Sequence, residues 1–357
     1  MIDKVFWQNK KVFITGHTGF KGSWLSLWLA SMGAEVKGYS LEPPTSPSLF
    51  EEASVADVLD SEIGDIRDLE KLTNSVVEFN PDVLFHMAAQ PLVRLSYKIP
   101  IETYEVNVIG TAKVLEAAKQ CKSLKAVISV TTDKCYENKE WVWGYRETDP
   151  MGGHDPYSSS KACAELVTSA YMRSFYKEMG IGLASVRAGN VIGGGDWADD
   201  RLMPDILRAF EKDKSVVIRN PKATRPWQHV LEPLSGYILL AEKLFDNPEL
   251  YSEGWNFGPN QDDVKPVEWI LNYVTDLWQG SSWTLEKDNN LHEAGYLKLD
   301  ISKAKSRLDW SPIWSLGESL KKIISWHRVW LDKGDMNREC LKEIEEFMRD
   351  MAHAESR

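Results

Sequence analysis

Three glycines at a spacing of three residues follow a short apolar segment near the start of the chain. Residues 12–15 are apolar except for the closing threonine, and Gly16, Gly19 and Gly22 come directly after them. Apolar side chains at helical spacing follow in residues 24–32. This order predicts a strand, a tight loop and a helix, in which glycine lets backbone amides approach a pyrophosphate at the helix N-terminus. The residues expected to contact a dinucleotide here are Gly16, His17, Thr18, Gly19, Phe20 and Gly22.

Short apolar segments alternate with longer helical segments over the first half of the chain. Further strands are predicted at residues 36–39, 58–63, 83–87, 126–131 and 182–187. Helices are predicted at residues 68–79, 101–121 and 157–179. Such alternation is typical of a parallel sheet covered by helices on both faces. The expected fold class is α/β, a Rossmann-like doubly wound parallel sheet with a smaller mixed C-terminal substrate lobe.

The regular alternation loosens after residue 187. We expect residues 1–187 to form the dinucleotide-binding domain and residues 188–357 to form mainly the substrate lobe and C-terminal helices. A return to the first domain is expected within residues 229–258, because residues 231–244 have a helical pattern. Residues 335–357 carry an amphipathic stripe, which predicts a helix that caps the fold or a partner subunit.

Composition and charge exclude several classes of function. The net charge of -11 argues against a broad nucleic-acid surface, which needs a basic face. The four cysteines have no short paired spacing, so we expect neither a metal site nor a disulfide framework. No apolar run approaches the roughly 18 residues of a membrane span, and residues 1–11 lack the apolar core of a secretory signal. We therefore expect a cytoplasmic protein without a membrane partner.

Tyr157 and Lys161 are four residues apart in a predicted helix, so they share one face. An ammonium beside a phenol stabilises the phenolate, and this makes the tyrosine a usable base near neutral pH. The pair therefore suits hydride transfer. Thr132, Asp133 and Lys134 follow the strand at residues 126–131 and add groups that simple alcohol oxidation does not require. The structural alternative is a loop salt bridge between Asp133 and Lys134.

Other residues are candidates for the dinucleotide site because of their places after predicted strands. Asp65 could bracket an adenine ring or could equally be the N-cap of the next helix. Asn107 either mends a local backbone kink near the site or is simply exposed. His86 is more readily explained as a buried histidine whose ring nitrogens are hydrogen-bonded within the protein. The candidate cofactor contacts beyond the glycine loop are Asp65, Ile66, Ala88, Ala89, Gln90 and Asn107, together with Tyr157 and Lys161.

The end of the second strand bears on the choice of cofactor. An acidic residue there normally binds the adenosine ribose, whereas the candidates in this chain are Tyr39, Ser40 and the more distant Glu42. Residues 38–41 contain no arginine, and this weakly favours NAD over NADP.

Nearly the whole chain resembles the extended short-chain dehydrogenase/reductase family, through the glycine loop, the run at 88–90, Asn107 and the Tyr157/Lys161 pair. The second half resembles the nucleotide-sugar branch of that family, at residues 190, 225–230, 255–258 and 310–326. Thr132 and Asp133 match the sugar-nucleotide 4,6-dehydratases, but Lys134 replaces the glutamate of most of these enzymes. That variant, with residues 16–24 and 43–45, resembles the members that act on CDP-glucose.

This resemblance implies a lyase that uses NAD within each turnover. The enzyme would oxidise C4, remove water across C5 and C6 and then reduce C6, giving CDP-4-dehydro-6-deoxy-D-glucose for deoxysugar and O-antigen polysaccharide synthesis. Tyr157 would take the C4 hydroxyl proton, with Lys161 lowering the pKa of its phenol. Thr132 would orient the sugar hydroxyl and Asp133 would donate a proton to the departing C6 hydroxyl. Lys134 would accept the C5 proton or stabilise the C4 enolate by its charge.

The alternative readings are a nucleotide-sugar epimerase or dehydrogenase of the same family, and a cofactor-binding sensor without catalysis. For the anionic end of the nucleotide sugar, the candidates are Asn190, Arg201, Arg225 and His229. Asn190 could instead be a turn residue, and His229 could equally stand at the start of a helix. The resemblance also implies a homodimer, assembled through the helices at 101–121 and 157–179.

Overall fold

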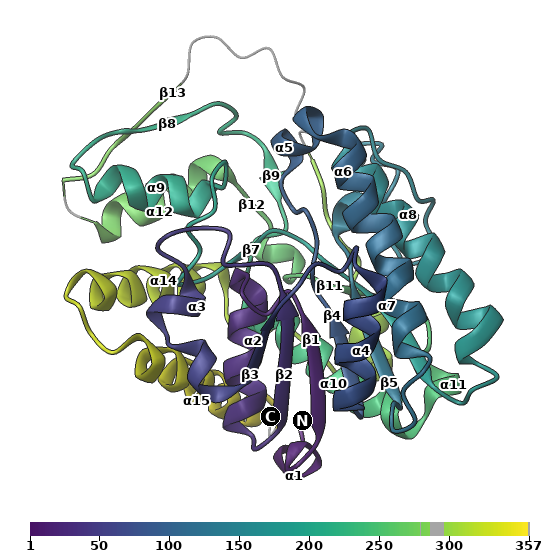
Figure 1. The fold of residues 1–357 in the computed structure, drawn as a ribbon. Coiled ribbons are helices and arrows are strands. Elements are labelled where there is room, and N and C mark those ends of the chain that lie inside the picture. Colours follow the sequence, from purple (N-terminus) through teal and green to yellow (C-terminus); the bar gives the residue numbers. More distant parts are fainter. Residues whose placement is uncertain (279, 286–295, 356–357) are drawn as a thin grey trace.

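A single parallel sheet organises the structure, which is a computed structural model describing residues 1–278, 280–285 and 296–355 (Figure 1). Within the described residues the sheet has seven strands in the order β3-β2-β1-β4-β5-β6-β11, and every neighbouring pair is parallel. The strands are β1 (Lys11–Thr15), β2 (Glu35–Ser40), β3 (Asp60–Ile63), β4 (Val83–His86), β5 (Ala126–Val130), β6 (Gly182–Ala188) and β11 (Gly254–Phe257). The predicted doubly wound α/β fold is confirmed, and all the strands predicted from sequence are present.

Helices cover both faces of this sheet, as Figure 1 shows. On one face lie α4 (Leu69–Phe79), α7 (Thr111–Ala118) and α8 (Pro156–Tyr171). On the other face lie α2 (Phe20–Ser31) and α10 (Leu231–Asp246). Strands β4, β5 and β6 are buried along their whole length, as expected for parallel strands covered on both sides.

Both of the long helices predicted from sequence contain a π-helical turn. The first runs through α6 (Pro100–Tyr104), a π-helical turn at Glu105–Gly110, and α7. The second runs through α8 and a π-helical turn at Met172–Tyr176. Such turns insert one extra residue into the helical repeat and are frequent at functional sites.

The chain leaves the sheet after β6 and returns to it with α10 and β11. Helix α10 packs against β5 and β6, and β11 pairs in parallel with β6, from Gly254 opposite Ser185 to Phe257 opposite Ala188. The predicted helix at 231–244 therefore does lie on the sheet. The domain boundary near residue 187 stays a proposal.

The segment between β6 and α10, together with part of the chain after β11, forms a smaller lobe beyond the carboxyl ends of the strands (Figure 1). Its apolar core is built from α9 (Leu202–Phe210), β8 (Val216–Ile218), α12 (Val267–Leu277) and α14 (Leu316–Leu331). Short strand pairs complete it: β7 (Val191–Ile192) with β10 (Gln228–His229), β9 (Thr224–Arg225) with β12 (Lys265–Pro266), and β8 with β13 (Trp283–Leu285).

Helix α15 (Met336–Glu355) closes the described part of the chain. It packs against α2 and α14, with Ile344 and Phe347 buried in the same apolar core as Trp28 of α2. The predicted amphipathic stripe therefore caps the fold of its own chain. The remaining short helices are α1 (Lys4–Trp7), α3 (Leu49–Glu52), α5 (Val93–Lys98), α11 (Pro248–Tyr251) and α13 (Ser302–Leu308).

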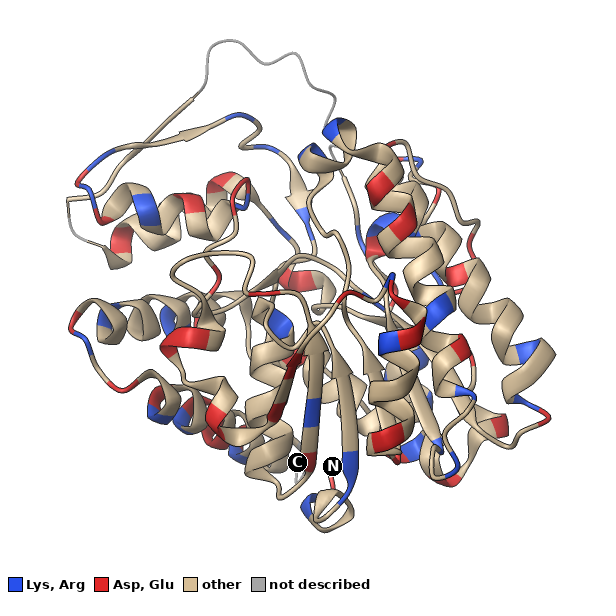
Figure 2. Ribbon diagram, viewed as in Figure 1, with Lys and Arg blue, Asp and Glu red and all other residues tan. Residues whose placement is uncertain are grey.

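Acidic and basic residues are interspersed along the outer helices rather than separated into two halves (Figure 2). No described helix is long and apolar enough to cross a membrane. Across residues 1–278, 280–285 and 296–355, no group of three or more His, Cys, Asp or Glu side chains could hold a metal ion. The cysteines Cys121, Cys135, Cys163 and Cys340 are unpaired thiols.

Candidate active site

The glycine loop packs closely against the backbone that follows β4. Gly16 has a φ of +82°, and a Cβ there would lie 2.7 Å from the Ala88 amide nitrogen. A Cβ on Gly22 would lie 2.1 Å from the Gly16 carbonyl oxygen. Both positions therefore require glycine, for the left-handed turn and for the contact between loop and helix. Gly19 is the N-cap of α2, and Phe20 is its first residue. The loop and Ala88 together form the backbone cradle that the sequence predicted.

Two hydroxyls join the glycine loop to the end of β2. The Thr18 hydroxyl donates to the Leu41 carbonyl at 2.8 Å and lies 2.8 Å from the Ser40 hydroxyl. Glu42 is exposed. The position where a ribose-binding acid is normally found is thus occupied by Ser40, which is already hydrogen-bonded to the loop.

His17 lies beneath this loop and not on its surface. Its side chain is fully buried against Gly38, its Nε2 is 2.7 Å from the Ser61 hydroxyl, and burial lowers its pKa to about 4. The imidazole is therefore neutral. Only the backbone of His17 is placed to contact a cofactor.

Asn107 fastens the segment after β4 to α8. Its Oδ1 accepts from the Gln90 amide at 2.9 Å, and its Nδ2 donates to the Gln90 carbonyl at 3.1 Å and to the Ser160 hydroxyl at 2.8 Å. The side chain is 1% exposed and lies in the first π-helical turn. Of the two alternatives for Asn107, the exposed one is therefore wrong; the side chain lies at the irregular helical turn, and its hydrogen bonds go to Gln90 and Ser160. Gln90 is held in addition by Thr103, to which its Nε2 donates at 3.0 Å.

Asp65 and Ile66 follow β3, as predicted, and one of the two alternatives for Asp65 is wrong. Asp65 is not the N-cap of α4, because Asp68 holds that position. The Asp65 carboxylate instead pairs with Arg67 at 2.7 Å, which lowers its pKa. Ile66 is buried in the core beside α4 and α7. Contact of either residue with an adenine ring stays a prediction.

His86 is a structural histidine, as the sequence favoured. Its Nδ1 lies 2.8 Å from the Thr15 hydroxyl and its Nε2 lies 2.9 Å from the Thr111 hydroxyl. Burial lowers its pKa to about 3. The ring therefore fixes β1, β4 and α7 to one another.

Thr132, Asp133 and Tyr157 meet at the carboxyl end of β5. Thr132 is the N-cap of a short 3₁₀ turn, Asp133–Cys135, and its hydroxyl donates to the Asp133 carboxylate at 3.1 Å. Tyr157 lies in the first turn of α8, where its phenol is hydrogen-bonded to Thr132. The helix begins at this point because Asp155 caps it and Pro156 occupies its first position.

Asp133 is a buried carboxyl with an unused oxygen. It is 2% exposed, and its Oδ2 has no hydrogen-bond partner among the described residues. Burial raises its pKa, although nearby Lys134, Thr132 and Arg225 act in the opposite direction. Since a raised pKa favours the protonated form, the carboxyl is suited to donate a proton.

Tyr157 and Lys161 are both buried beside this carboxyl, but they are not directly bonded. Burial raises the pKa of Tyr157 to about 12, against the opposing effects of the Thr132 hydrogen bond and of Arg201. Lys161 donates from its Nζ to the Val130 carbonyl at 3.1 Å, and burial lowers its pKa to about 8. Burial outweighs these opposing effects, so the phenol pKa is raised overall, and a lowering contribution from Lys161 stays a prediction.

Lys134 lies on the same turn as Asp133 and is partly buried. Its backbone amide donates to the Thr132 hydroxyl at 3.4 Å. Between the described side chains of Asp133 and Lys134, no ion pair is formed. The alternative of a simple loop salt bridge is therefore not what the structure shows.

The residues predicted for the anionic end of a substrate are only partly brought together. Arg201 is the residue before α9 and pairs with Asp196 at 2.9 Å, yet it is close enough to Tyr157 to affect the pKa of the phenol. Arg225 is buried in β9 and close enough to influence Asp133. Asn190 follows β6, where its carbonyl accepts from the Gln228 amide at 3.0 Å.

His229 is not placed for substrate contact. It is completely buried between Trp24 and Trp314, and its Nε2 lies 2.9 Å from the Glu343 carboxylate of α15. Its Nδ1 accepts from the Leu231 amide at 3.3 Å, at the first residue of α10. The prediction of a nucleotide contact is therefore not supported, and the helix-start alternative is correct.

Sequence reasoning missed two residues that border the catalytic cluster. Lys21 follows Phe20 in α2 and is influenced by the charges of Lys161, Arg201 and Asp133. Tyr237, from α10, is influenced by Asp133 and Tyr157. The sequence did offer a reason to consider Lys21, because this lysine lies between Gly19 and Gly22 of the glycine motif. Nothing in the pattern of α10 distinguishes Tyr237 from a core residue.

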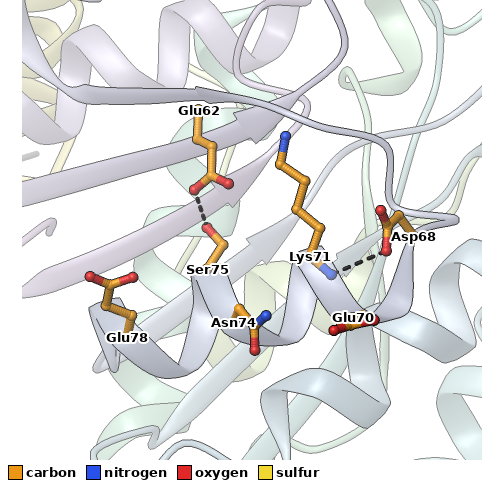
Figure 3. Close-up of a pocket in the computed structure, with 7 residues that line it drawn as sticks. All are labelled: Glu62, Asp68, Glu70, Lys71, Asn74, Ser75 and Glu78. Atoms are coloured by element: carbon orange, nitrogen blue, oxygen red, sulfur yellow. Dashed lines mark hydrogen bonds between the residues drawn. The ribbon is translucent and has the colours of Figure 1, made fainter.

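A separate polar hollow of about 290 Å³ lies beside β3 and α4 (Figure 3). In it the Ser75 hydroxyl donates to Glu62 at 2.6 Å, and the Lys71 amide donates to Asp68 at 3.1 Å. Its other lining residues are Glu70, Asn74 and Glu78. It contains none of the residues predicted for catalysis or for the cofactor.

The fold and the Tyr157/Lys161 cluster beside a glycine loop define the class of extended short-chain dehydrogenases/reductases. Two solved structures of 22% sequence identity share the fold. One is the epimerase Mth375 of Methanothermobacter thermautotrophicus, with a TM-score of 0.79, covering 93% of this chain and 96% of that one. The other is the dTDP-glucose 4,6-dehydratase of Bacillus anthracis in complex with NAD, with a TM-score of 0.75, covering 92% and 99%.

Within that class, the chain belongs to the GDP-mannose 4,6-dehydratase family, whose model matches residues 13–323. The CDP-glucose 4,6-dehydratase of Salmonella typhimurium strain LT2 is 60% identical over 354 residues, which cover 98% of this chain and 99% of that enzyme. The CDP-paratose 2-epimerase of Salmonella typhi is 24% identical and covers 88% of this chain and 98% of its own length.

Proposed function

We propose that this protein is an NAD-dependent hydro-lyase that converts CDP-D-glucose into CDP-4-dehydro-6-deoxy-D-glucose and water, for deoxysugar and O-antigen polysaccharide synthesis. The observation that carries the proposal is the buried Asp133 carboxyl with a free oxygen, beside Thr132 and Tyr157. A dehydrogenase or an epimerase needs the phenol but has no leaving hydroxyl to protonate. The 60% identity to the CDP-glucose 4,6-dehydratase supports the choice of substrate.

The glycine cradle fits a dinucleotide cofactor. The packing of Gly16 on Ala88 and of Gly22 on Gly16 leaves the loop amides at the N-terminus of α2, where a pyrophosphate is stabilised. When bound, NAD supplies an acceptor for a hydride and returns the hydride later in the same turnover. Ala88, Ala89 and the Gln90/Asn107 clamp would line the path of the cofactor toward Tyr157.

Oxidation at C4 comes first, because a ketone at C4 makes the proton on C5 acidic. Tyr157 accepts the C4 hydroxyl proton, and Thr132 orients that hydroxyl through the hydrogen bond it shares with the phenol. Since the pKa of Tyr157 is raised to about 12, the phenol needs positive charge nearby to act at neutral pH. Arg201 is close enough to lower the pKa of the phenol, and we propose that Lys161 adds further positive charge.

Elimination of water then requires an acid at C6 and a base at C5. Asp133 is proposed as the acid, because burial raises its pKa, which favours the protonated form, and its Oδ2 has no partner among the described residues. Lys134 follows it on the same turn and is proposed as the base. In this assignment the C5 proton passes to the Lys134 amine as the C6 hydroxyl leaves with the Asp133 proton.

For the diphosphate of the substrate we propose Arg201, Arg225 and Asn190 as contacts. Both arginines lie near the catalytic cluster, and guanidinium groups bind phosphate in a bidentate way. Arg201 is already paired with Asp196, so it would act from a fixed position. His229 is left out of this set because it is buried.

We also infer a cytoplasmic homodimer. Helices α6 and α8 lie on the outside of the molecule (Figure 1), and together with the π-helical turns that continue them they carry large exposed apolar residues. They are Ile101 at 71% exposure, Ile109 at 51%, Leu166 at 61% and Phe175 at 41%. Apolar clusters of this kind mark interaction surfaces. Four free thiols suit a reducing compartment.

One assay tests the reaction. Purified protein is incubated with CDP-glucose and NAD, and the product is identified by mass and by NMR. We expect loss of one water with no net NADH. A product of unchanged mass and inverted stereochemistry would support an epimerase, and stoichiometric NADH would support a dehydrogenase. Cofactor binding with neither product would support a sensor.

A further inference from the structure

Lys21 and Tyr237 form a second amine and phenol pair beside the proposed catalytic one. The Lys21 Nζ donates to the Tyr237 hydroxyl over 3.4 Å and lies 5.4 Å from the centroid of the ring. Tyr237 is fully buried on α10, whereas Lys21 is the second residue of α2. The pair therefore links α2, the helix that follows the glycine loop, to α10, the helix that comes before the last strand of the sheet.

Charged groups from several elements surround the Lys21 amine. Lys161 of α8 and Arg201, the residue before α9, repel its positive charge, and Asp133 of the turn after β5 attracts it when the carboxyl is ionised. The side chain as a whole is only partly buried, but its amino group is enclosed. Burial is the largest effect, and together with the two cations it lowers the pKa of Lys21 to about 7. Lys21 therefore changes its charge in the range in which an enzyme works.

We propose that the Lys21 ammonium, held by Tyr237, is a positioning residue that favours the neutral reduced nicotinamide over the cationic oxidised one. The proposal rests on the NAD cofactor proposed above. Removal of hydride from a sugar carbon breaks its C–H bond and delivers two electrons to the cofactor, whose ring loses its positive charge. A fixed cation beside the site repels the positively charged ring of the oxidised cofactor. It does not repel the neutral ring of the reduced cofactor. Lys21 would thus strengthen the cofactor as the oxidant of C4.

The proton on Lys21 gives this preference a pH dependence with a definite sign. Below pH of about 7 the amine is charged, so the preference for the reduced cofactor is strongest. As the pH rises through about 7, the amine loses its proton and the preference weakens. The pyrophosphate is common to NAD and NADH, so its attraction for Lys21 cancels in the ratio of their affinities.

The test uses binding alone, without sugar substrate. Dissociation constants of NAD and NADH are measured by calorimetry between about pH 6 and about pH 8.5, on either side of the Lys21 transition. For the unaltered protein we expect the ratio Kd(NAD)/Kd(NADH) to fall by roughly tenfold over this range, equivalent to ~1.4 kcal/mol. Lys21→Met should show a low ratio already at about pH 6, and any pH dependence that remains in this variant belongs to Lys161, whose pKa is lowered to about 8.

Two further variants separate charge from structure. Lys21→Arg should show the high ratio at every pH, because a guanidinium stays protonated. Lys4→Met removes an exposed lysine on α1 and should behave like the unaltered protein.

A ratio that does not change with pH in the unaltered protein would overturn the role of Lys21, and this measurement needs no variant. An unchanged ratio in a folded Lys21→Met protein would overturn it as well. Failure of both nucleotides to bind would instead contradict the proposed cofactor, and the Lys21 proposal with it.

Discussion

Among single residues, Asp133 and Lys134 matter most, because they separate a dehydratase from the other enzymes that share Tyr157. The Asp133 carboxyl is buried, which raises its pKa and favours the protonated form, and its Oδ2 has no partner among the described residues. Lys134 forms no ion pair with Asp133 in the described chain. The Lys134 amine is therefore not held by the neighbouring carboxyl, and in its neutral form it could accept the C5 proton.

We expect Lys134→Ala to oxidise C4 normally but to slow exchange of the C5 proton with solvent by about 10²-fold or more, the usual size of a lost general base. Transient NADH is followed by stopped-flow absorbance, and deuterium at C5 is followed by NMR. Tyr157→Phe is the control, because it should block both signals. Normal deuterium incorporation in Lys134→Ala would remove the residue from the base role.

For single residues, the sequence predicted which side chains belong to the candidate site better than it predicted what those side chains contact. Thr132, Asp133 and Tyr157 were predicted together because their order along the chain is set by the fold. The burial of His229 was not predictable, because it depends on Glu343 of α15 and on Trp314, which come much later in the chain. Lys21 was visible inside the glycine motif, but its pairing with Tyr237 depends on the return of α10 to the sheet.

Among the elements, α10 joins the candidate site to distant parts of the chain. It carries Tyr237 to the site, and its first turn holds the segment before α14 through Glu232. That carboxyl accepts the backbone amides of Ile313 at 3.0 Å and of Trp314 at 2.7 Å. Glu232 is 1% exposed, and burial raises its pKa to about 8.

A pH dependence of stability follows from Glu232. The folded chain binds a proton at this carboxyl up to a pH of about 8, whereas the unfolded chain releases it near the ordinary value of 4.5. The contribution to stability is therefore full below about 4.5 and is lost as the pH rises through about 8. We expect Glu232→Gln to flatten the dependence of the unfolding free energy on pH in this window, measured by urea unfolding. A slope identical to that of the unaltered protein would contradict the assignment.

The strands were predictable because a fully buried parallel strand is a short apolar run with clear ends. The π-helical turns were not, because they depend on tertiary contacts. Asn107 is held by Gln90 and Ser160, and neither partner is adjacent to it in the sequence. The prediction of one helix at residues 101–121 therefore gave nearly the right residues. It did not foresee the π-helical turn that interrupts the α-helix.

In the whole molecule, the apolar face of α6 and α8 is the feature that the single chain leaves uncovered. Figure 1 shows these helices side by side on the outside of the layer that covers one face of the sheet. A second copy of the same face would bury Ile101, Ile109 and Leu166. The pair of helices then forms a bundle across the two-fold axis.

We expect Leu166→Glu to convert the dimer to a monomer, because it would bury two carboxylates near the axis. Sedimentation velocity measures the mass, and circular dichroism checks that the fold is kept. Val5→Glu on α1 is the matched control, since Val5 is 72% exposed and lies away from this face. A variant that stays dimeric would place the interface elsewhere, and an unaltered protein that sediments as a monomer would contradict the dimer.

Strand β11 comes about 70 residues after β6, its neighbour in the sheet, and this distance in sequence matters for incomplete chains. Until residues 254–257 are added, β6 has a row of backbone N–H and C=O groups with no neighbouring strand. An open edge of this kind is a template for pairing with other chains, and in the folded protein β6 is buried along its whole length. Fragments that stop before Gly254 should therefore aggregate through β6, so a nascent or proteolysed chain is exposed to this hazard until its second half has folded back.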